Sequence, residues 1–165
     1  MKSKLLLLVL SAFIVCCTQK QELTQKEKDQ IKSEVKAAVD NILVKFEKLD
    51  PSLVTECYWD SPDFIEISVD GSKADFQTSK KGTSDFLSAA ASVKLTLTKE
   101  DYKCLSKDIV ICAWFGKEEI TLKTGEAITI SPLITTLIFK NIEGKWKAIY
   151  LHESGTETIL PVGKK

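Results

Sequence analysis

The chain has 165 residues with 23 basic and 23 acidic side chains, so its formal net charge at pH 7 is zero. This balance leaves no net electric field that would steer nucleic acid or an acidic substrate toward the protein. All of the basic residues are lysine, and the absence of the arginine fork disfavours bidentate recognition of phosphate, although an AT-rich genome would produce the same composition.

The first 17 residues predict export. Two lysines precede a mostly apolar run that ends at Val15, and Cys16 and Cys17 follow it. A short basic segment before about 11 apolar residues is typical of a secretory signal, and the run is too short to span a bilayer.

The end of this segment resembles a bacterial lipobox, which implies that a cysteine becomes the lipidated mature N-terminus. A lipobox has an aliphatic residue at −3 and a small one at −1. Acceptor Cys17 would have Ile14 and Cys16 there, whereas acceptor Cys16 would have Phe13 and Val15, so we predict lipidation at Cys17. The resemblance implies an exported protein, lipid-anchored in the bacterial cell envelope. An ordinary cleaved signal peptide is the alternative.

Residues 18–23 are polar and are predicted to form a tether, followed by one domain at 24–155 and a C-terminal tail at 156–165. Thr24 and Glu27 have the spacing of a helix capping box. Beyond them apolar residues recur at steps of three and four, which predicts an amphipathic helix over 25–49, at Ile31, Val35, Ala38, Ile42, Phe46 and Leu49. Asp50 and Pro51 end it and begin a short second helix, 52–58.

The rest of the domain reads mainly as strands. A first strand at 64–69 ends in the turn Asp70-Gly71, residues 72–82 are predicted to be a loop, and a third helix is predicted at 83–91. Further strands are expected at 93–97, 109–115, 120–122, 127–141 and 145–154, with an interruption or bulge at Pro132. Helices followed by a meander of strands predict an α+β domain with helices on one face of an antiparallel sheet.

The cysteines and the single histidine limit which disulfides and metal sites the chain can form. Cys104 and Cys112 flank a predicted turn, and could form a disulfide or remain buried thiols like Cys57. With no C-x-x-C pair and one histidine, the sequence shows no zinc site, and we expect no metal or other cofactor.

Residues 135–154, TTLIFKNIEGKWKAIYLHES, resemble the C-terminal hairpin of the SnoaL-like, nuclear transport factor 2-like superfamily. The last strand, from Gly144 to Gly155, is also similar to the association domain of calmodulin-dependent kinase II. The resemblance implies a cone: a curved antiparallel sheet wrapped around a long N-terminal helix, with a pocket. The superfamily includes ketosteroid isomerases, polyketide cyclases, dehydratases and oligomerisation hubs, so the fold does not fix an activity.

Strand alternation predicts which residues of the last strand share a face, and the resemblance directs that face to the pocket. Trp146, Ala148, Tyr150, His152 and Ser154 belong to this set. Aromatic residues on other segments are candidates for its walls. The predicted ligand pocket comprises Trp59, Tyr102, Trp114, Trp146, Tyr150, His152 and Ser154.

Two functions follow as hypotheses. The favoured one is a lipoprotein module that holds a small apolar ligand or a protein partner. The alternative is an isomerase, cyclase or dehydratase with the only histidine, His152, as general base, Tyr150 as proton donor and Asp63 as the orienting carboxylate. The sequence favours a structural role for His152, closing the hairpin by hydrogen bonds, over a catalytic one.

The face opposite the predicted pocket is also apolar. Ile149 and Leu151 point to it, and Ile138 lies on the same face of the preceding strand. An exposed apolar patch of this kind indicates an interface, so we expect a two-fold homodimer through these three residues. The alternative is that residues 72–82 or the tail 156–165 cover this face.

Overall fold

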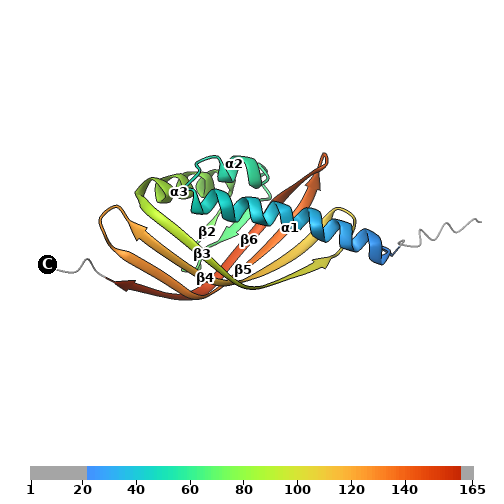
Figure 1. Ribbon diagram of the computed structural model, residues 1–165. Helices are drawn as coiled ribbons and strands as arrows, with labels where there is room; N and C mark the ends of the chain where they lie inside the picture. Colours follow the sequence, from blue (N-terminus) through green and yellow to red (C-terminus); the bar gives the residue numbers. More distant parts are fainter. Residues whose placement is uncertain (1–21, 161–165) are drawn as a thin grey trace, which may run out of the picture.

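The computed structural model describes residues 22–160, in which three helices pack on one face of a curved six-stranded sheet (Figure 1). The elements in chain order are α1 (Gln25–Glu47), α2 (Leu53–Cys57), β1 (Ile65–Ile67), β2 (Lys73–Ala74), α3 (Phe76–Ala89), β3 (Ala90–Cys104), β4 (Ile109–Leu122), β5 (Ala127–Ile142) and β6 (Lys145–Leu160). The predicted α+β class and cone are confirmed, whereas the signal and lipobox at 1–17 lie outside the described residues.

The strand order is β2-β1-β6-β5-β4-β3. The four long strands β3 to β6 form an antiparallel meander, as expected. The sheet is not purely antiparallel, because β1 runs parallel to β6 and places Ile65 beside Tyr150 and Ile67 beside His152. The long connection between β1 and β6, through α3 and four strands, permits this parallel pair.

Helix α1 begins as its sequence predicts. The Thr24 backbone N–H donates to the Glu27 carboxylate at 2.9 Å, and the Glu27 N–H donates to the Thr24 hydroxyl at 3.3 Å. This capping box satisfies two donors that the first helical turn leaves without partners. Val35, Val39 and Ile42 lie on the buried stripe of the helix and pack into the core.

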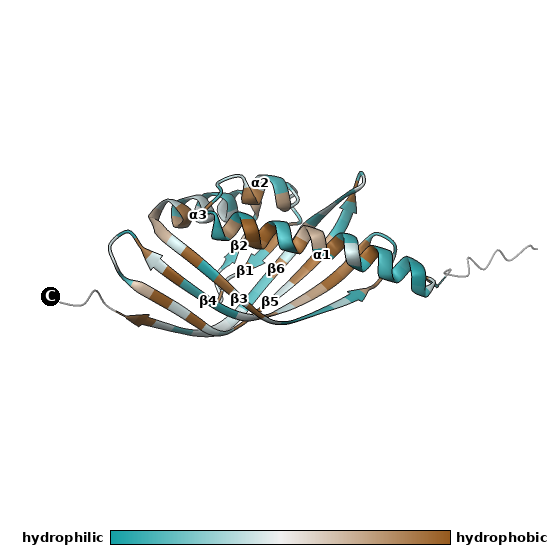
Figure 2. Ribbon diagram, viewed as in Figure 1, coloured by the Kyte–Doolittle hydropathy of each residue, from teal (hydrophilic) through white to brown (hydrophobic). Residues whose placement is uncertain are grey.

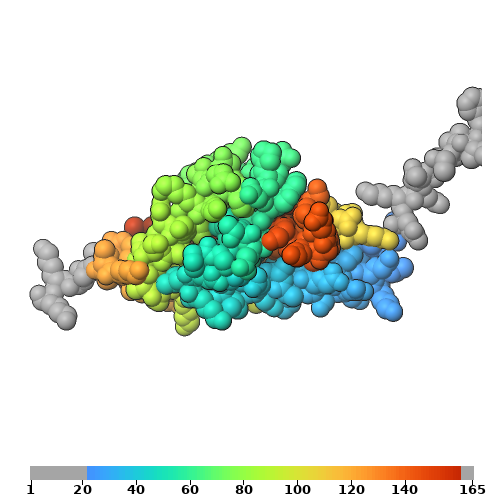
Figure 3. Space-filling model, turned by 90° about the horizontal axis from the view of Figure 1, so that it is seen from above, coloured from blue at the N-terminus to red at the C-terminus, as the bar shows by residue number. Residues whose placement is uncertain are grey.

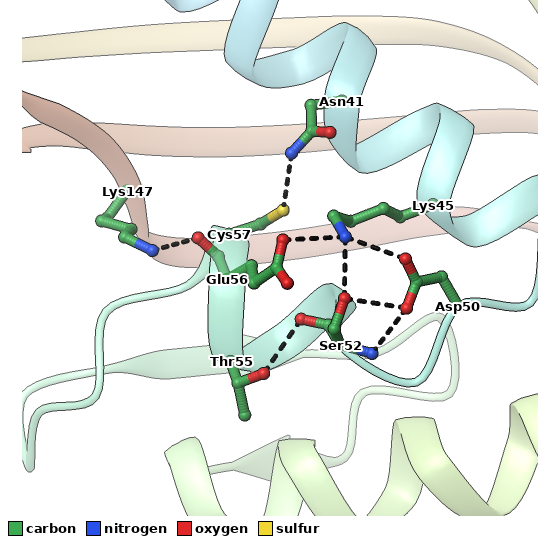
Figure 4. Close-up of polar contacts among 8 residues, drawn as sticks. All are labelled: Asn41, Lys45, Asp50, Ser52, Thr55, Glu56, Cys57 and Lys147. Carbon is green, nitrogen blue, oxygen red and sulfur yellow. Dashed lines mark hydrogen bonds and ion pairs between the residues drawn. The ribbon is translucent and has the colours of Figure 1, made fainter.

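A polar network fixes the end of α1 against α2 (Figure 4). The Lys45 ammonium contacts the carboxylates of Asp50 and Glu56, each at 2.8 Å, and donates to the Ser52 hydroxyl at 2.7 Å. Hydrogen bonds from Lys45 and Ser52 lower the pKa of Asp50 to about 2, and the same contacts raise the pKa of Lys45. The network therefore joins the last turn of α1 to the start of α2.

Helix α3 begins inside the segment 72–82 that was expected to be a loop. Asp75 is its N-cap and accepts a hydrogen bond from the Thr78 N–H at 2.8 Å. Only Phe76, Ser79 and Leu87 of this helix are buried, and the serine hides the apolar periodicity of the sequence. The strands are longer than predicted as well: β4 is continuous, and β6 runs to Leu160, so residues 156–160 pair with β5 rather than forming a tail.

A β-bulge at Ile149 reverses the faces of the second half of β6. Phe139 of β5 pairs with Ala148, but Ile138 pairs with Tyr150, so Ile149 has no partner of its own. An extra residue of this kind shifts the side-chain alternation by one position. The prediction that Trp146, Ala148, Tyr150, His152 and Ser154 share one face is therefore wrong.

The inner face of the sheet and the helices enclose one main core, with a smaller cluster around Val93 and Ile120. Figure 3 shows α1, α2 and α3 covering this side, together with the end of the β5–β6 hairpin. No described helix covers the outer face (Figure 1). Apolar and polar residues alternate along the long strands, as the bands of the ribbon in Figure 2 show. The cysteines Cys57, Cys104 and Cys112 are free thiols, two of them buried.

The two ends of the described chain lie at opposite ends of the molecule. Helix α1 begins at one end, beyond the β3–β4 and β5–β6 hairpins, and β6 ends at the other (Figure 1). Within residues 22–160 no helix is both long enough and apolar enough to cross a bilayer.

Candidate functional site

Three glutamates from different strands face the inside of the cone: Glu66 of β1, Glu118 of β4 and Glu153 of β6. The register explains their common direction. Glu66 lies beside the buried Leu151, and Glu153 beside the buried Thr135. Glu118 alternates with buried residues along β4. No ion pair between residues 22 and 160 includes any of the three.

Glu118 is the most enclosed of the three, with only 5% of its surface exposed. Transfer of a carboxylate out of water disfavours the charged form. Desolvation therefore raises the pKa of Glu118 to about 8, and the negative charge of Glu153 contributes in the same direction. Near neutral pH the group is mainly a neutral carboxylic acid, which both donates and accepts hydrogen bonds.

Glu153 lies on the same inner surface, where the Thr135 hydroxyl contacts its Oε1 at 3.5 Å. Desolvation and then the charge of Glu66 raise its pKa to about 7, against a smaller opposing effect of Thr135. The residue nevertheless keeps part of its surface accessible to solvent.

The Ser79 hydroxyl of α3 hydrogen-bonds to the Glu66 carboxylate and ties the helix to the acidic group. Tyr58 is only 7% exposed and is stacked on Phe64 with 5.4 Å between ring centroids. Burial raises the pKa of the Tyr58 phenol well above its ordinary value, and the charges of Glu66 and Glu153 add to this effect. The phenol therefore stays protonated and remains a hydrogen-bond donor.

Trp114 completes the interior with a donor that has no partner. It is 2% exposed, and its Nε1–H finds no acceptor among the residues that the structure describes. Trp114, Thr135 and Glu153 form one row across three strands. The indole extends along β4 over Gly116 toward Glu118, because a side-chain carbon at Gly116 would lie 2.3 Å from its six-membered ring.

Of the predicted pocket residues, Trp114, Tyr102 and Trp146 lie on the inner side. Tyr102 is half-buried, donates a hydrogen bond to Glu100 at 3.0 Å, and packs against the core, where burial raises its pKa. Trp146 packs against the core and donates from its Nε1 to Glu34 of α1 at 3.0 Å. Tyr102 and Trp146 thus brace the sheet against α1, while Trp114 lies among the glutamates.

The other predicted site residues lie on the outer side. Beyond the bulge, Tyr150, His152 and Ser154 pair with outward-facing residues of β5, and His152 and Ser154 are exposed. The Lys140 ammonium lies over the Trp59 ring, 4.8 Å from its centroid. This outer set is Trp59, Tyr150, His152 and Ser154.

The proposed base, donor and orienter are not brought together. The imidazole of His152 lies 6.5 Å, centroid to centroid, from the Tyr150 ring in an edge-on arrangement. Asp63 is exposed and precedes β1 by two residues, whereas the residue beside His152 is Ile67 at the far end of that strand. Among residues 22–160 the imidazole makes no side-chain hydrogen bond.

Sequence reasoning missed all three glutamates. Glu118 sits in the run Lys117-Glu118-Glu119, which looks like a solvated segment, and Glu153 was assigned to the outer face. The available signal was alternation along β4: Glu118 is in phase with Trp114 and Ile120, which are both buried. A carboxylate at a buried position of a strand is uncommon unless it is paired, and this indicates a site.

An open hollow of about 380 Å³ lies between the ends of α1 and α3 and the β4–β5 turn, lined by Leu49, Pro51, Ser84, Leu87, Ser88, Ala90, Ala91 and Lys123. Its only charged side chain, Lys123, donates to the Ser88 carbonyl at 2.6 Å, so it brings no convergent polar groups to a ligand. No three His, Cys, Asp or Glu side chains are placed to hold a metal ion, within the described chain.

No protein-family model matches this chain, and no curated protein sequence matches it. Solved structures do. A nuclear transport factor 2-like superfamily protein from Salmonella enterica serovar Typhimurium is 15% identical, with 78% of this chain and 92% of that one covered at a TM-score of 0.68. A hexachlorocyclohexane dehydrochlorinase, LinA-type3, from Novosphingobium barchaimii is 14% identical. The match covers 83% of this chain and 94% of that chain at a TM-score of 0.65.

A third similar structure is an uncharacterized protein with a cystatin-like fold from Caulobacter vibrioides, 15% identical, with 77% of this chain and 90% of that chain covered at a TM-score of 0.62. Identities this low identify the fold alone. The chain therefore has the nuclear transport factor 2-like cone fold, which its C-terminal hairpin predicted. Because this fold is found both in an enzyme and in a protein without assigned activity, the function has to be argued from the site.

Proposed function

We propose that this chain is a lipoprotein of the bacterial cell envelope, anchored through Cys17, whose cone domain binds a small ligand in its interior. One observation carries the binding function: among residues 22–160, the carboxyl groups of Glu118 and Glu153 inside the cone have no cationic partner, and the buried Trp114 Nε1–H has no acceptor. Buried groups of this kind are costly unless they serve a function.

The binding proposal is tested on the soluble domain, residues 18–165, with a mixture of small fragments and the indole N–H resonances as the readout. Binding inside the cone moves the Trp114 signal and leaves that of Trp59, on the outer side, in place. Trp114→Phe identifies the signal. If every fragment that binds moves only Trp59, or if none moves Trp114, the interior is not a ligand site.

The anchor is tested on the full chain. We expect Cys17→Ser to release the protein from the membrane fraction and to abolish labelling by a fatty-acid probe, while Cys16→Ser, the matched control, keeps both. Loss of labelling with Cys16→Ser alone would move the acceptor, and no labelling of the parent would remove the lipoprotein proposal.

A second candidate is an acid–base enzyme that uses Glu153 in place of His152. The supporting observation is a carboxyl with a pKa of about 7, because a general base is most effective when its pKa is near the working pH. The Tyr58 phenol and the acid form of Glu118 would supply proton donors. The test is turnover of carbon acids, with Glu153→Gln expected to abolish it and His152→Ala to preserve it.

A further inference from the structure

We infer that the cone interior selects an organic cation, an ammonium compound that also carries an oxygen acceptor, held between Glu66, Glu153 and Glu118. This inference rests on the proposed ligand-binding function and names the chemical class of the ligand. It depends on three features: uncompensated acidic groups, aromatic surfaces beside them, and an unpartnered donor.

The acidic groups have no cation from the protein. The ion pairs of the described chain all involve other carboxylates. The charges that raise the pKa values of Glu118 and Glu153 belong to other glutamates, and no lysine lowers either pKa. The charge of Glu66 opposes ionisation of Glu153, and the charge of Glu153 opposes ionisation of Glu118, so a positive charge among these groups would relieve the repulsion. A ligand cation supplies that charge, whereas an anion or a second carboxylate would add to the repulsion.

Aromatic rings border the acidic groups. Tyr58 is close enough to Glu66 and Glu153 for their charges to act on its phenol, and it stacks on Phe64, which in turn meets Phe76 edge to face at 5.9 Å between centroids. Trp114 borders the same interior from β4. Ring faces next to carboxylates are the surroundings that favour ammonium groups, through cation–π attraction and direct ion pairing.

The unpartnered donor is independent of the acidic cluster. Trp114 is 2% exposed, its indole extends toward Glu118, and its row across the sheet ends at Glu153. A buried N–H without an acceptor costs about 1–3 kcal/mol, which an acceptor atom of the ligand removes. The ligand class is therefore an ammonium group with an ether, hydroxyl or carbonyl oxygen close by.

The test compares two probes of one shape. The first is (2-phenoxyethyl)trimethylammonium, and the second is its neutral carbon isostere, 3,3-dimethylbutyl phenyl ether. Neither probe titrates, so any effect of pH on their relative affinity belongs to the protein. Dissociation constants are measured by titration of the soluble domain, with the Trp114 indole N–H resonance reporting where each probe binds.

We expect the cation to bind about tenfold more tightly than the isostere at pH 8.5, which corresponds to about 1.4 kcal/mol, and the preference to fall as the acids protonate toward pH 5.5. Glu153→Gln should remove most of the preference and leave binding of the isostere unchanged. Glu157→Gln, at an exposed position of the same strand, is the control and should keep it.

The two proposals fail in different ways. If the isostere moves Trp114 and binds as tightly as the cation, the interior binds ligands but does not select cations. If the preference survives Glu153→Gln together with Glu66→Gln, it arises elsewhere and the inference is wrong. If neither probe, nor any fragment of the mixture above, moves Trp114, the ligand-binding function itself is refuted.

Discussion

Burial makes the ionised form of Glu118 costly, and this ties the stability of the domain to pH. Its pKa rises from 4.5 when unfolded to about 8 when folded, so the folded state binds this proton more tightly. The stabilisation is present below pH 4.5 and is lost as the pH rises through 8. At the acidic end, the lowered pKa of Asp50 has the opposite sign and acts below pH 4.

We therefore predict that the free energy of unfolding falls between pH 5 and pH 9, by an amount on the order of a few kcal/mol from Glu118 and Glu153 together. Glu118→Gln should flatten this decline and be more stable than the parent at pH 8.5. Urea denaturation at several pH values measures the free energy of unfolding of the parent and the variant. Glu119 pairs with Lys117 at the surface, so the control variant Glu119→Gln should leave the decline unchanged. Parallel curves for parent and Glu118→Gln would show that Glu118 is solvated.

Glu153 gives a second prediction that can be followed directly. Its side-chain carboxyl carbon should titrate with a midpoint near pH 7 in ¹³C NMR of the soluble domain, and the signal should be missing in Glu153→Gln. Since the Glu66 charge contributes to the raised pKa, Glu66→Gln should lower the midpoint. A midpoint near 4.5 in the parent would mean that the carboxyl faces bulk water.

At the scale of single residues, the sequence predicted the aromatic side chains better than the acidic ones. Trp114 was named as a pocket residue and borders the site, because a tryptophan in an apolar strand usually turns its large ring to the buried side of the sheet. Glu118 and Glu153 could not be found from local polarity, since a buried and an exposed glutamate look alike in a sequence. Their burial follows from the register of distant strands, which is a property of the whole sheet.

At the scale of the elements, features with local sequence signals were predicted, and features that depend on distant segments were not. The capping box and the apolar steps through Val35 and Ile42 predicted α1 nearly to the residue, because helix signals are local. The start of α3 was missed because its cap, Asp75, is followed by a largely polar helix with few buried residues. The bulge at Ile149 has no sequence signature, since its cause is the pairing of β6 with a curved β5.

The bulge makes a prediction about two adjacent residues. Leu151 is 6% exposed and faces the core, whereas His152 is exposed on the outer face. Leu151→Ala should cost about 2–5 kcal/mol of unfolding free energy, and His152→Ala should change it by less than about 0.5 kcal/mol. Urea denaturation of the soluble domain compares them. A larger effect of His152→Ala would restore the uninterrupted alternation that the sequence alone predicts.

At the scale of the whole molecule, one face of the sheet carries no helix from residues 22–160, and this face is apolar. Rows of partly exposed residues cross it, and their chief members are Ile65, Ile67, Ile111, Phe115, Ile134, Ile138 and Tyr150. Of the residues first assigned to the interface, Ile138 belongs to these rows, Ile149 is the bulge residue, and Leu151 faces the core. A homodimer through this outer face remains our proposal, since a second copy would cover it with a matching surface.

We predict that the soluble domain sediments as a dimer at tens of micromolar and that Ile138→Lys together with Ile111→Lys makes it a monomer, because two charges would be buried in the interface. Ala37→Lys, on the exposed side of α1, is the control and should remain dimeric. A monomeric parent would refute the dimer, and a dimer unaffected by the two outer lysines would place the interface on another surface.

The separation of the chain ends has a practical meaning for anyone who labels or immobilises this protein. Helix α1 starts at one end of the molecule and β6 finishes at the other (Figure 1). A fluorophore or an affinity handle joined after Lys165 would therefore extend from the end of the domain remote from the start of α1. Joining the two ends directly, as in a circular permutant, would need a linker long enough to run the length of the cone.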